Sequence, residues 1–249
     1  MKFKHTEVFN FEGALRGLRN PMGSWARSDS KYKCCTKCTR DYCDSRDCNL
    51  DEYVIGKNDM ELAQKLIRAG SEHRKFMRQI FVSVDITAPL YVFKELDTYK
   101  VGTVANSTST MHKLTGQPIT IDCFETGDYD RSLSVRSGEH YDEDYDGIPI
   151  NAFAEGLIDS LEGLRLKYLE TKDKRYWKEL IRWLPESWLQ TRTITMSYEN
   201  IYNIVRQRRG HKLNEWSGTD NPELPNFIAW ARTLPYAQEL IFLDEENGQ

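Results

Sequence analysis

The sequence predicts an α+β fold in which several helices accompany a sheet. Residues 80–86, Ile-Phe-Val-Ser-Val-Asp-Ile, alternate in polarity and are rich in β-branched side chains, as is typical of a strand with one buried face. Apolar residues recur at helical spacing in 58–69 and 153–170. At 249 residues and 39% hydrophobic content, the chain is long and apolar enough for one elaborated domain that spans 1–249.

The other expected elements follow from local signals. Residues 6–20 indicate a short strand that leads into a helix and stops at Asn20-Pro21. Thr87 is a candidate N-cap and Pro89 suits a first helical turn, so we expect a helix from Leu90 to about Tyr99. Three later segments also predict helices: 174–183, 197–209 and 224–233.

Two segments lack this periodicity, a Cys-rich loop at 30–50 and an acidic inserted loop at 122–148. Five of the six cysteines lie in the first loop, and four of them supply the thiolates that a tetrahedral zinc ion needs: Cys35, Cys38, Cys43 and Cys48. Free intracellular thiols and a redox cluster are the alternatives, because the spacing matches no familiar zinc finger.

The acidic loop contains Asp142-x-Asp144-x-Asp146-Gly147, which matches the opening half of a calcium-binding loop. The twelfth position of that loop, which carries a bidentate acid in calcium sites, is Phe153. The pattern therefore favours a solvated acidic loop over a calcium site.

Composition excludes some functions. A net charge of −4, from 38 acidic and 34 basic residues, argues against a general nucleic-acid binder, so a phosphate site must be local. The sequence has no run of about 18 apolar residues and no signal-like start, so we expect a cytoplasmic protein without a membrane partner. It has no glycine-rich phosphate loop, and its five histidines lack the spacing of zinc hydrolases.

Residues 84–114, VDITAPLYVFKELDTYKVGTVANSTSTMHKL, resemble the flavin-dependent thymidylate synthase family. In that family a strand enters a helix through Ala-Pro, the helix ends in Arg-His-Arg, and a loop carrying Ser, Asn, Glu, Ser, Arg and Tyr follows. Ala88-Pro89 match directly. The Arg-His-Arg positions are occupied by Thr98, Tyr99 and Lys100, when one extra residue is allowed in the loop.

The loop keeps two of the family's polar residues, Asn106 and Ser109. Ser107 stands in place of the acidic residue, Met111 in place of the arginine and His112 in place of the tyrosine. Charged positions of the motif are therefore lost.

A second segment, LPESWLQTRTITMSYENIYNIVRQRRGHKLNEW, aligns without a gap to the nucleotide and flavin segment of the same family. In this alignment Asn203 matches a flavin-contacting asparagine, Arg208 matches the arginine that holds the uracil ring, and Lys212 replaces a histidine. Upstream, GSEHRKF places His73 where the family has a flavin-contacting His-Glu-Thr element.

The resemblance implies a mixed sheet flanked by helices, the thymidylate synthase-complementing (flavin-dependent) type of fold, and a homotetramer with shared active sites. It implies transfer of a methyl group to C5 of deoxyuridine monophosphate (dUMP), with FAD as cofactor and NADPH and methylenetetrahydrofolate as co-substrates. The implied catalytic residues are Ser109 and Arg208. The implied cofactor-binding residues are His73, Thr98, Tyr99, Lys100, Asn106, Asn203 and Lys212. The implied substrate-binding residues are Glu95, Ser107, Ser109, Arg192 and Arg208.

The altered motif leaves the activity open. A buried phosphate dianion needs cationic donors, so methionine at position 111 removes an important one. The cations that could compensate are Lys100, Lys113, Arg182, Arg192, Arg206, Arg208 and Arg209. The alternatives are a related pyrimidine modification such as hydroxymethylation, a catalytically inactive nucleotide-binding homologue, or a zinc-organised interaction protein. Read without the resemblance, Tyr99 is a packing residue and 206–211 is a solvated helix end.

Overall fold

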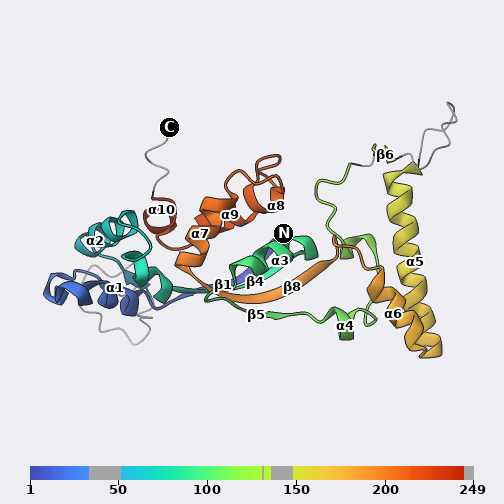
Figure 1. Cartoon of the computed structure of the whole chain (residues 1–249), viewed down its shortest axis with the longest axis horizontal. Coiled ribbons are helices and arrows are strands. Elements are labelled where there is room, and N and C mark those ends of the chain that lie inside the picture. Colours follow the sequence, from blue (N-terminus) through green and yellow to red (C-terminus); the bar gives the residue numbers. More distant parts are fainter. Residues whose placement is uncertain (34–51, 131, 136–147, 244–249) are drawn as a thin grey trace. The chain divides into compact units, whose positions relative to one another are not determined.

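The computed structural model describes residues 1–33, 52–130, 132–135 and 148–243 (Figure 1). Its helices and sheet confirm the predicted α+β class. The strands of the largest sheet are, in spatial order, β1 (Lys2–Phe9), β4 (Phe81–Pro89), β8 (Leu189–Ser197) and β5 (Val104–Ser107). Two short antiparallel pairs join β2 (Lys31–Lys33) to β3 (Glu52–Val54) and β6 (Ser134–Val135) to β7 (Ile148–Pro149).

The helices include all those that the sequence predicts. Their bounds are α1 Phe11–Arg19, α2 Lys57–Arg68, α3 Leu90–Leu96, α4 Thr110–Lys113, α5 Ile150–Thr171, α6 Lys174–Arg182, α7 Tyr198–Arg208, α8 Asn214–Ser217, α9 Phe227–Arg232 and α10 Ala237–Leu240. Short 3-10 segments include η3 (Arg74–Gln79), η4 (Asp97–Tyr99) and η5 (Ile121–Cys123). In the described part of the chain, no helix combines the length and the apolar character that crossing a membrane requires.

The chain divides into two compact units. The first contains Met1, Ile86–Thr98 and Asn106–Arg192, and the second contains Lys2–Asp85, Tyr99–Ala105 and Thr193–Gln249. That the whole chain acts as a single domain stays a prediction.

The first unit has its core where α5 packs against α6 (Figure 1). Leu161 of α5 and Leu180 of α6 are fully buried, and Phe124 packs with them in the same cluster. Phe124 also lies edge-on against Trp188, with ring centroids 5.5 Å apart. Phe124, near the start of the predicted acidic loop at 122–148, therefore belongs to this core, which the acidic composition of its neighbours does not reveal.

Helix α5 buries a narrower face than its sequence suggests. Leu161 is fully buried and Ile158 is partly buried, as expected, but Leu169 near the end of the helix is 37% exposed. The buried face is completed by Arg165, which donates to the Glu162 carboxylate at 2.6 Å and 2.7 Å and to the Thr115 carbonyl at 3.2 Å. A guanidinium thus connects this helix to the loop before it.

The second unit has an aromatic core. Trp216 and Phe227 are fully buried with ring centroids 5.4 Å apart, and Phe227 lies 5.2 Å from Trp230. Phe3 of β1 stacks on Trp230 at 4.9 Å with nearly parallel rings. Large rings bury much apolar area, and offset or edge-on pairs add a favourable electrostatic contribution. This cluster holds α8 and α9 beside the start of the chain.

A buried ion pair joins α1, α2 and the segment before β2. Asp59 is fully buried and accepts a hydrogen bond of 2.5 Å from the Arg19 Nε atom. The hydroxyl groups of Ser28 and Ser30 donate to the other carboxylate oxygen at 2.6 Å and 2.5 Å. Burial alone raises the pKa of Asp59, but these donors outweigh burial and hold the pKa below its ordinary value.

The strand that enters α3 is longer than predicted. It runs through Thr87, Ala88 and Pro89, so Pro89 takes the N-cap position and Thr87 caps nothing. The Thr87 hydroxyl instead bonds the Thr191 hydroxyl at 2.7 Å. Pairing with a neighbouring strand, which sequence does not reveal, keeps these residues extended. The predicted helix also ends earlier, at Leu96, where η4 follows.

Two candidate metal sites lie outside the described residues: the cysteines Cys35, Cys38, Cys43 and Cys48, and the aspartates Asp142, Asp144 and Asp146. Among the residues that are described, no group of His, Cys, Asp or Glu has the geometry to hold a metal ion. The zinc site stays a prediction.

Replacing Asp59 with asparagine is expected to lower the free energy of unfolding by about 3 kcal/mol at pH 7, because Arg19 is left buried without its counter-charge. Chemical denaturation measures this difference. The exposed Glu61→Gln variant on the same helix is the control, and it should lose less than about 1 kcal/mol because its pair with Lys57 is solvent-exposed.

The same pair of proteins tests the pH dependence. The pKa of Asp59 is lower in the folded state, so its contribution is fully present above the unfolded value of about 4 and is lost as pH falls through the folded value. The difference in stability between the wild type and Asp59→Asn should therefore shrink below about pH 4. A difference that stays constant down to pH 2 would contradict this account.

Candidate functional site

A cavity of about 440 Å³ in the second unit is lined by arginines. Its walls come from the end of α2, from the segment that follows α2, and from the C-terminal half of α7. The lining residues are Ile67, Arg68, Gly70, Arg74, Tyr202, Asn203, Arg206 and Gln207. Three guanidinium groups around one hollow make a local anion site in a chain whose net charge is negative.

Arg74 is held in place by Glu199 and Asn203. Its Nε atom donates to Glu199 Oε1 at 3.2 Å, and an Nη atom donates to Asn203 Oδ1 at 3.2 Å. Glu199, which is only 9% exposed, also accepts from Arg78. The hydrogen bond to Glu199 raises the pKa of Arg78. One buried carboxylate therefore fixes two arginines of η3, and one of them, Arg74, lines the cavity.

The ring of Tyr202 lies between two of these cations. The guanidinium carbon of Arg74 is 4.6 Å from the ring centroid, and that of Arg206 is 5.2 Å from it. Arg206 also donates to the Tyr202 hydroxyl at 2.5 Å. Such contacts orient a guanidinium through the aromatic quadrupole.

The start of α7 determines where these side chains point. Ser197 accepts from the Asn200 backbone N–H at 3.2 Å, and Asn200 accepts from the Ser197 backbone N–H at 3.0 Å, which completes a capping box. Glu199 follows in the first turn, where the helix dipole favours a carboxylate. Asn203 lies one turn further on the same face.

Arg208, at the end of α7, belongs to a second cluster in this unit. Its Nε atom donates to the Tyr99 hydroxyl at 3.1 Å, and Tyr99 donates to Gln207 Oε1 at 3.1 Å. The guanidinium carbon lies 5.1 Å from the Trp216 ring and 5.7 Å from the Tyr99 ring. The structure thus brings together two residues that the sequence predicted separately, Tyr99 and Arg208.

In the first unit, Arg192 is held by its own neighbours. Its Nε atom donates to Gln190 Oε1 at 2.8 Å and an Nη atom donates to Asp97 Oδ1 at 3.0 Å. The guanidinium lies 4.1 Å from the centroid of the Phe93 ring. An arginine with these contacts is oriented, but part of its charge is offset by Asp97.

In the first unit, three polar residues make mainly structural contacts: Thr98, Thr108 and Ser109. Ser109 is the N-cap of α4 and accepts from the His112 backbone N–H at 3.1 Å. Thr108 forms backbone hydrogen bonds to Thr191 and to the Gln190 side chain, both at 2.8 Å. Thr98 donates to the Glu95 carbonyl at 2.7 Å.

The other predicted site residues do not belong to the arginine-lined cavity or to the cluster of Tyr99 and Arg208. Five of them are exposed to solvent: His73, Lys100, Asn106, Ser107 and Lys212. Asn214, where the resembling family has glutamine, is buried and uses its amide on the backbone of Asn221 at 2.8 Å and 3.0 Å, so its role is structural. Met111 is 46% exposed.

Sequence reasoning missed Arg74, Glu199 and Tyr202. Arg74 lies in the same short segment as His73, and Glu199, Asn203 and Tyr202 share a helix, so helical spacing gave a partial signal. The missing information is the pairing of Arg74 with Glu199 across 125 residues of sequence.

Together, these groups are chemically suited to an organic ligand that carries phosphate. The arginines match phosphate oxygens, and the Asn203 amide and the Tyr202 ring offer a hydrogen bond and an aromatic face. A flavin dinucleotide has these features, since its pyrophosphate is anionic and its rings stack. The residues present therefore fit at least this part of such a cofactor.

No protein-family model matches the chain, and no curated protein does. Solved structures do match it. The flavin-dependent thymidylate synthase ThyX from Helicobacter pylori, complexed with FAD and dUMP, is 16% identical with a TM-score of 0.59, over 98% of this chain and 99% of that chain. The UMP/dUMP methylase PolB from Streptomyces cacaoi, bound with 5-Br dUMP, is 13% identical with a TM-score of 0.53, over 97% and 95%. The chain therefore has the fold of the flavin-dependent thymidylate synthases.

Proposed function

We propose that this chain is a flavin-dependent enzyme that transfers a one-carbon unit to C5 of dUMP. FAD is its cofactor, NADPH and methylenetetrahydrofolate are its co-substrates, and the enzyme is a cytoplasmic homotetramer. The observation that carries the proposal is the arginine-lined cavity beside Asn203, in a chain whose fold is that of a solved ThyX bound to FAD and dUMP.

The residues of the cavity hold the cofactor. Arg68 and Arg74 bind phosphate oxygens of FAD, and the Asn203 amide and the exposed His73 contact the rest of it. Bound FAD supplies the redox chemistry that the conversion of methylene to methyl requires. Glu199 does not touch the ligand, but it sets the angle at which Arg74 presents its donors.

The uracil ring of the nucleotide is bound by Arg208, in the second unit. A guanidinium offers several N–H donors in one plane, which suits the carbonyl oxygens of a uracil ring. Tyr99 fixes one edge of Arg208, so the remaining donors face a defined direction.

A second candidate function is nucleotide binding without catalysis. Its motivation is that Ser107 and Met111, two positions where the resembling family carries charge, are neutral and exposed here. Tight binding of dUMP without flavin and without turnover would distinguish this function from the first.

The purified protein is expected to be yellow or to become so when FAD is added, and to release tritium from C5-labelled dUMP in the presence of methylenetetrahydrofolate and NADPH. An absorbance spectrum and a tritium-release assay measure the two parts. Colourless protein that does not bind added FAD would exclude the flavoenzyme.

Arg74→Gln is expected to weaken FAD binding about tenfold, because a charged hydrogen bond to phosphate contributes about 1.5 kcal/mol. Fluorescence titration with FAD measures the dissociation constant. The control is Lys75→Gln, the adjacent residue, whose side chain is 62% exposed and paired only with Glu72. Equal affinity in Arg74→Gln and Lys75→Gln would show that the cavity is not the cofactor site.

Tyr99→Phe keeps the ring and removes the hydroxyl that accepts from Arg208. We expect dUMP affinity to fall about tenfold while FAD affinity changes little, because only the orientation of Arg208 is lost. Calorimetric titrations with each ligand separate the two effects. A parallel loss of FAD and dUMP binding would mean that Tyr99 acts on the fold and not on Arg208.

A further inference from the structure

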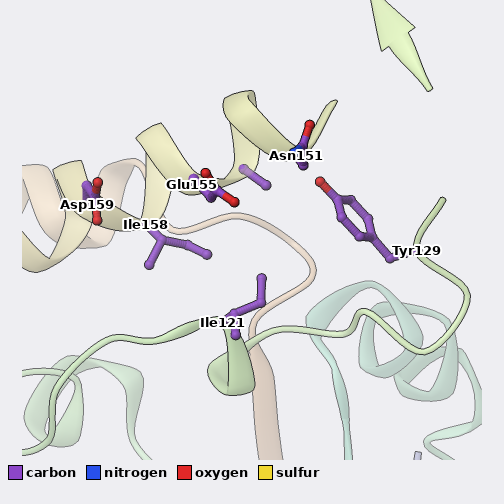
Figure 2. A pocket seen from close by; sticks show the side chains of 7 residues that line it. Ile121, Tyr129, Asn151, Glu155, Ile158 and Asp159 are labelled. Atoms are coloured by element: carbon purple, nitrogen blue, oxygen red, sulfur yellow. The ribbon is translucent and has the colours of Figure 1, made fainter. Parts of the chain in front are cut away.

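A second cavity, of about 410 Å³, lies in the first unit and involves none of the residues that the proposed function uses (Figure 2). One wall is the first half of α5, and the other is formed by η5 and the turn that follows it. The lining residues are Ile121, Tyr129, Asn151, Ala154, Glu155, Ile158 and Asp159. Its volume lies in the range of small-molecule sites, which is roughly 300–1,000 Å³.

Two polar atoms in this cavity are buried without a partner. The Tyr129 hydroxyl and Asn151 Oδ1 are shielded from solvent, and no atom of the described residues forms a hydrogen bond with either. Figure 2 shows the Tyr129 hydroxyl pointing toward Asn151 from the opposite wall. Buried polar atoms in folded proteins nearly always have partners, so two unpaired ones in one cavity indicate that a ligand supplies them.

The cavity also carries negative charge. Asn151, Glu155 and Asp159 follow at intervals of four residues on α5, which places them along one stripe of the helix. Within the described part of the chain, neither Glu155 nor Asp159 has an ion-pair partner. The two carboxylates lie about one helical turn apart, roughly 5.4 Å along the axis.

These features define the chemistry of the occupant. Asn151 Oδ1 and the two carboxylates only accept hydrogen bonds, so the ligand must bring N–H donors and positive charge. Ile121, Ala154 and Ile158 offer apolar surface to a hydrocarbon chain between the charges. We propose that this cavity binds an aliphatic diamine, with one ammonium group at each carboxylate and a short carbon chain against the isoleucines.

Calorimetric titration of the full-length protein with 1,4-diaminobutane, without flavin or nucleotide, tests the proposal. Saturable binding at one site is expected. The uncharged 1,4-butanediol, which has the same chain length, should bind at least tenfold more weakly. Because no turnover is measured, the result is independent of the proposed enzymatic function. Absence of diamine binding, or equal binding of the diol, would overturn the proposal.

Variants locate the binding site. Glu155→Gln and Asp159→Asn should each weaken diamine binding about tenfold, since each removes one charged contact. Glu170→Gln, an exposed carboxylate on the same helix outside the cavity, should leave it unchanged. Tyr129→Phe should also bind the diamine more weakly, because it removes a hydroxyl that faces the ligand. Its melting temperature should be unchanged or higher, because the hydroxyl that it removes is buried without a partner. Equal affinity in all four variants, or competition by Mg²⁺ or Ca²⁺ at the same site, would refute the diamine site.

Discussion

The carboxylate of Glu199 is the group on which the arginine-lined cavity depends. It is nearly buried and accepts hydrogen bonds from Arg74 and Arg78, which lie together in η3. A buried carboxylate is stable only when its charge is offset and its oxygens are bonded. The contact therefore joins the first turn of α7 to η3 and carries Arg74 to the wall of the cavity. From there Arg74 contacts Asn203 and the Tyr202 ring, so one ion pair helps to connect three groups that line the cavity.

The cations that line the cavity differ in how firmly their side chains are held. Arg74 is fixed by Glu199, which lowers the entropy that it loses when a ligand binds but also offsets part of its charge. Arg68 is exposed and lies at the end of α2, and within the described residues its side chain makes no hydrogen bond or ion pair. The cavity thus presents one oriented donor, Arg74, and one solvent-exposed charge, Arg68.

The sequence predicted the elements with strong local signals and missed those that depend on distant partners. Helices α2, α5, α6 and α7 follow apolar periodicity, and their limits differ from the predicted ones by a few residues. Strand β8 was missed because its residues were aligned only as part of a longer segment, and β4 extends to Pro89 because of strand pairing. The buried Phe124 was missed because its neighbours are acidic.

The same contrast, between residues with a local signal and residues that depend on a distant partner, applies to the candidate site. Asn203 and Arg208 are predicted from their place in a resembling segment, and the structure places Asn203 in the wall of the arginine-lined cavity and Arg208 beside Trp216. Their roles stay predictions. Arg74 was not found, because its importance comes from Glu199, which is 125 residues away in sequence. No local pattern encodes such a pair. The capping box that positions Glu199, in contrast, is formed by residues three positions apart and can be recognised in the sequence.

The contact between Tyr99 and Arg208 gives a physical reason for one difference from the resembling family, in the motif where that family has Arg-His-Arg. The resembling family carries histidine at this position, and a protonated imidazole next to the Arg208 guanidinium would be repelled by it. A tyrosine carries no positive charge and so avoids that repulsion, accepts a hydrogen bond from Nε, and offers an aromatic ring to the cation. Tyr99 therefore holds Arg208 by a hydrogen bond without placing a second positive charge beside it. The altered position thus supports the orientation of Arg208 by a different contact, because the Tyr99 hydroxyl and ring both face the guanidinium.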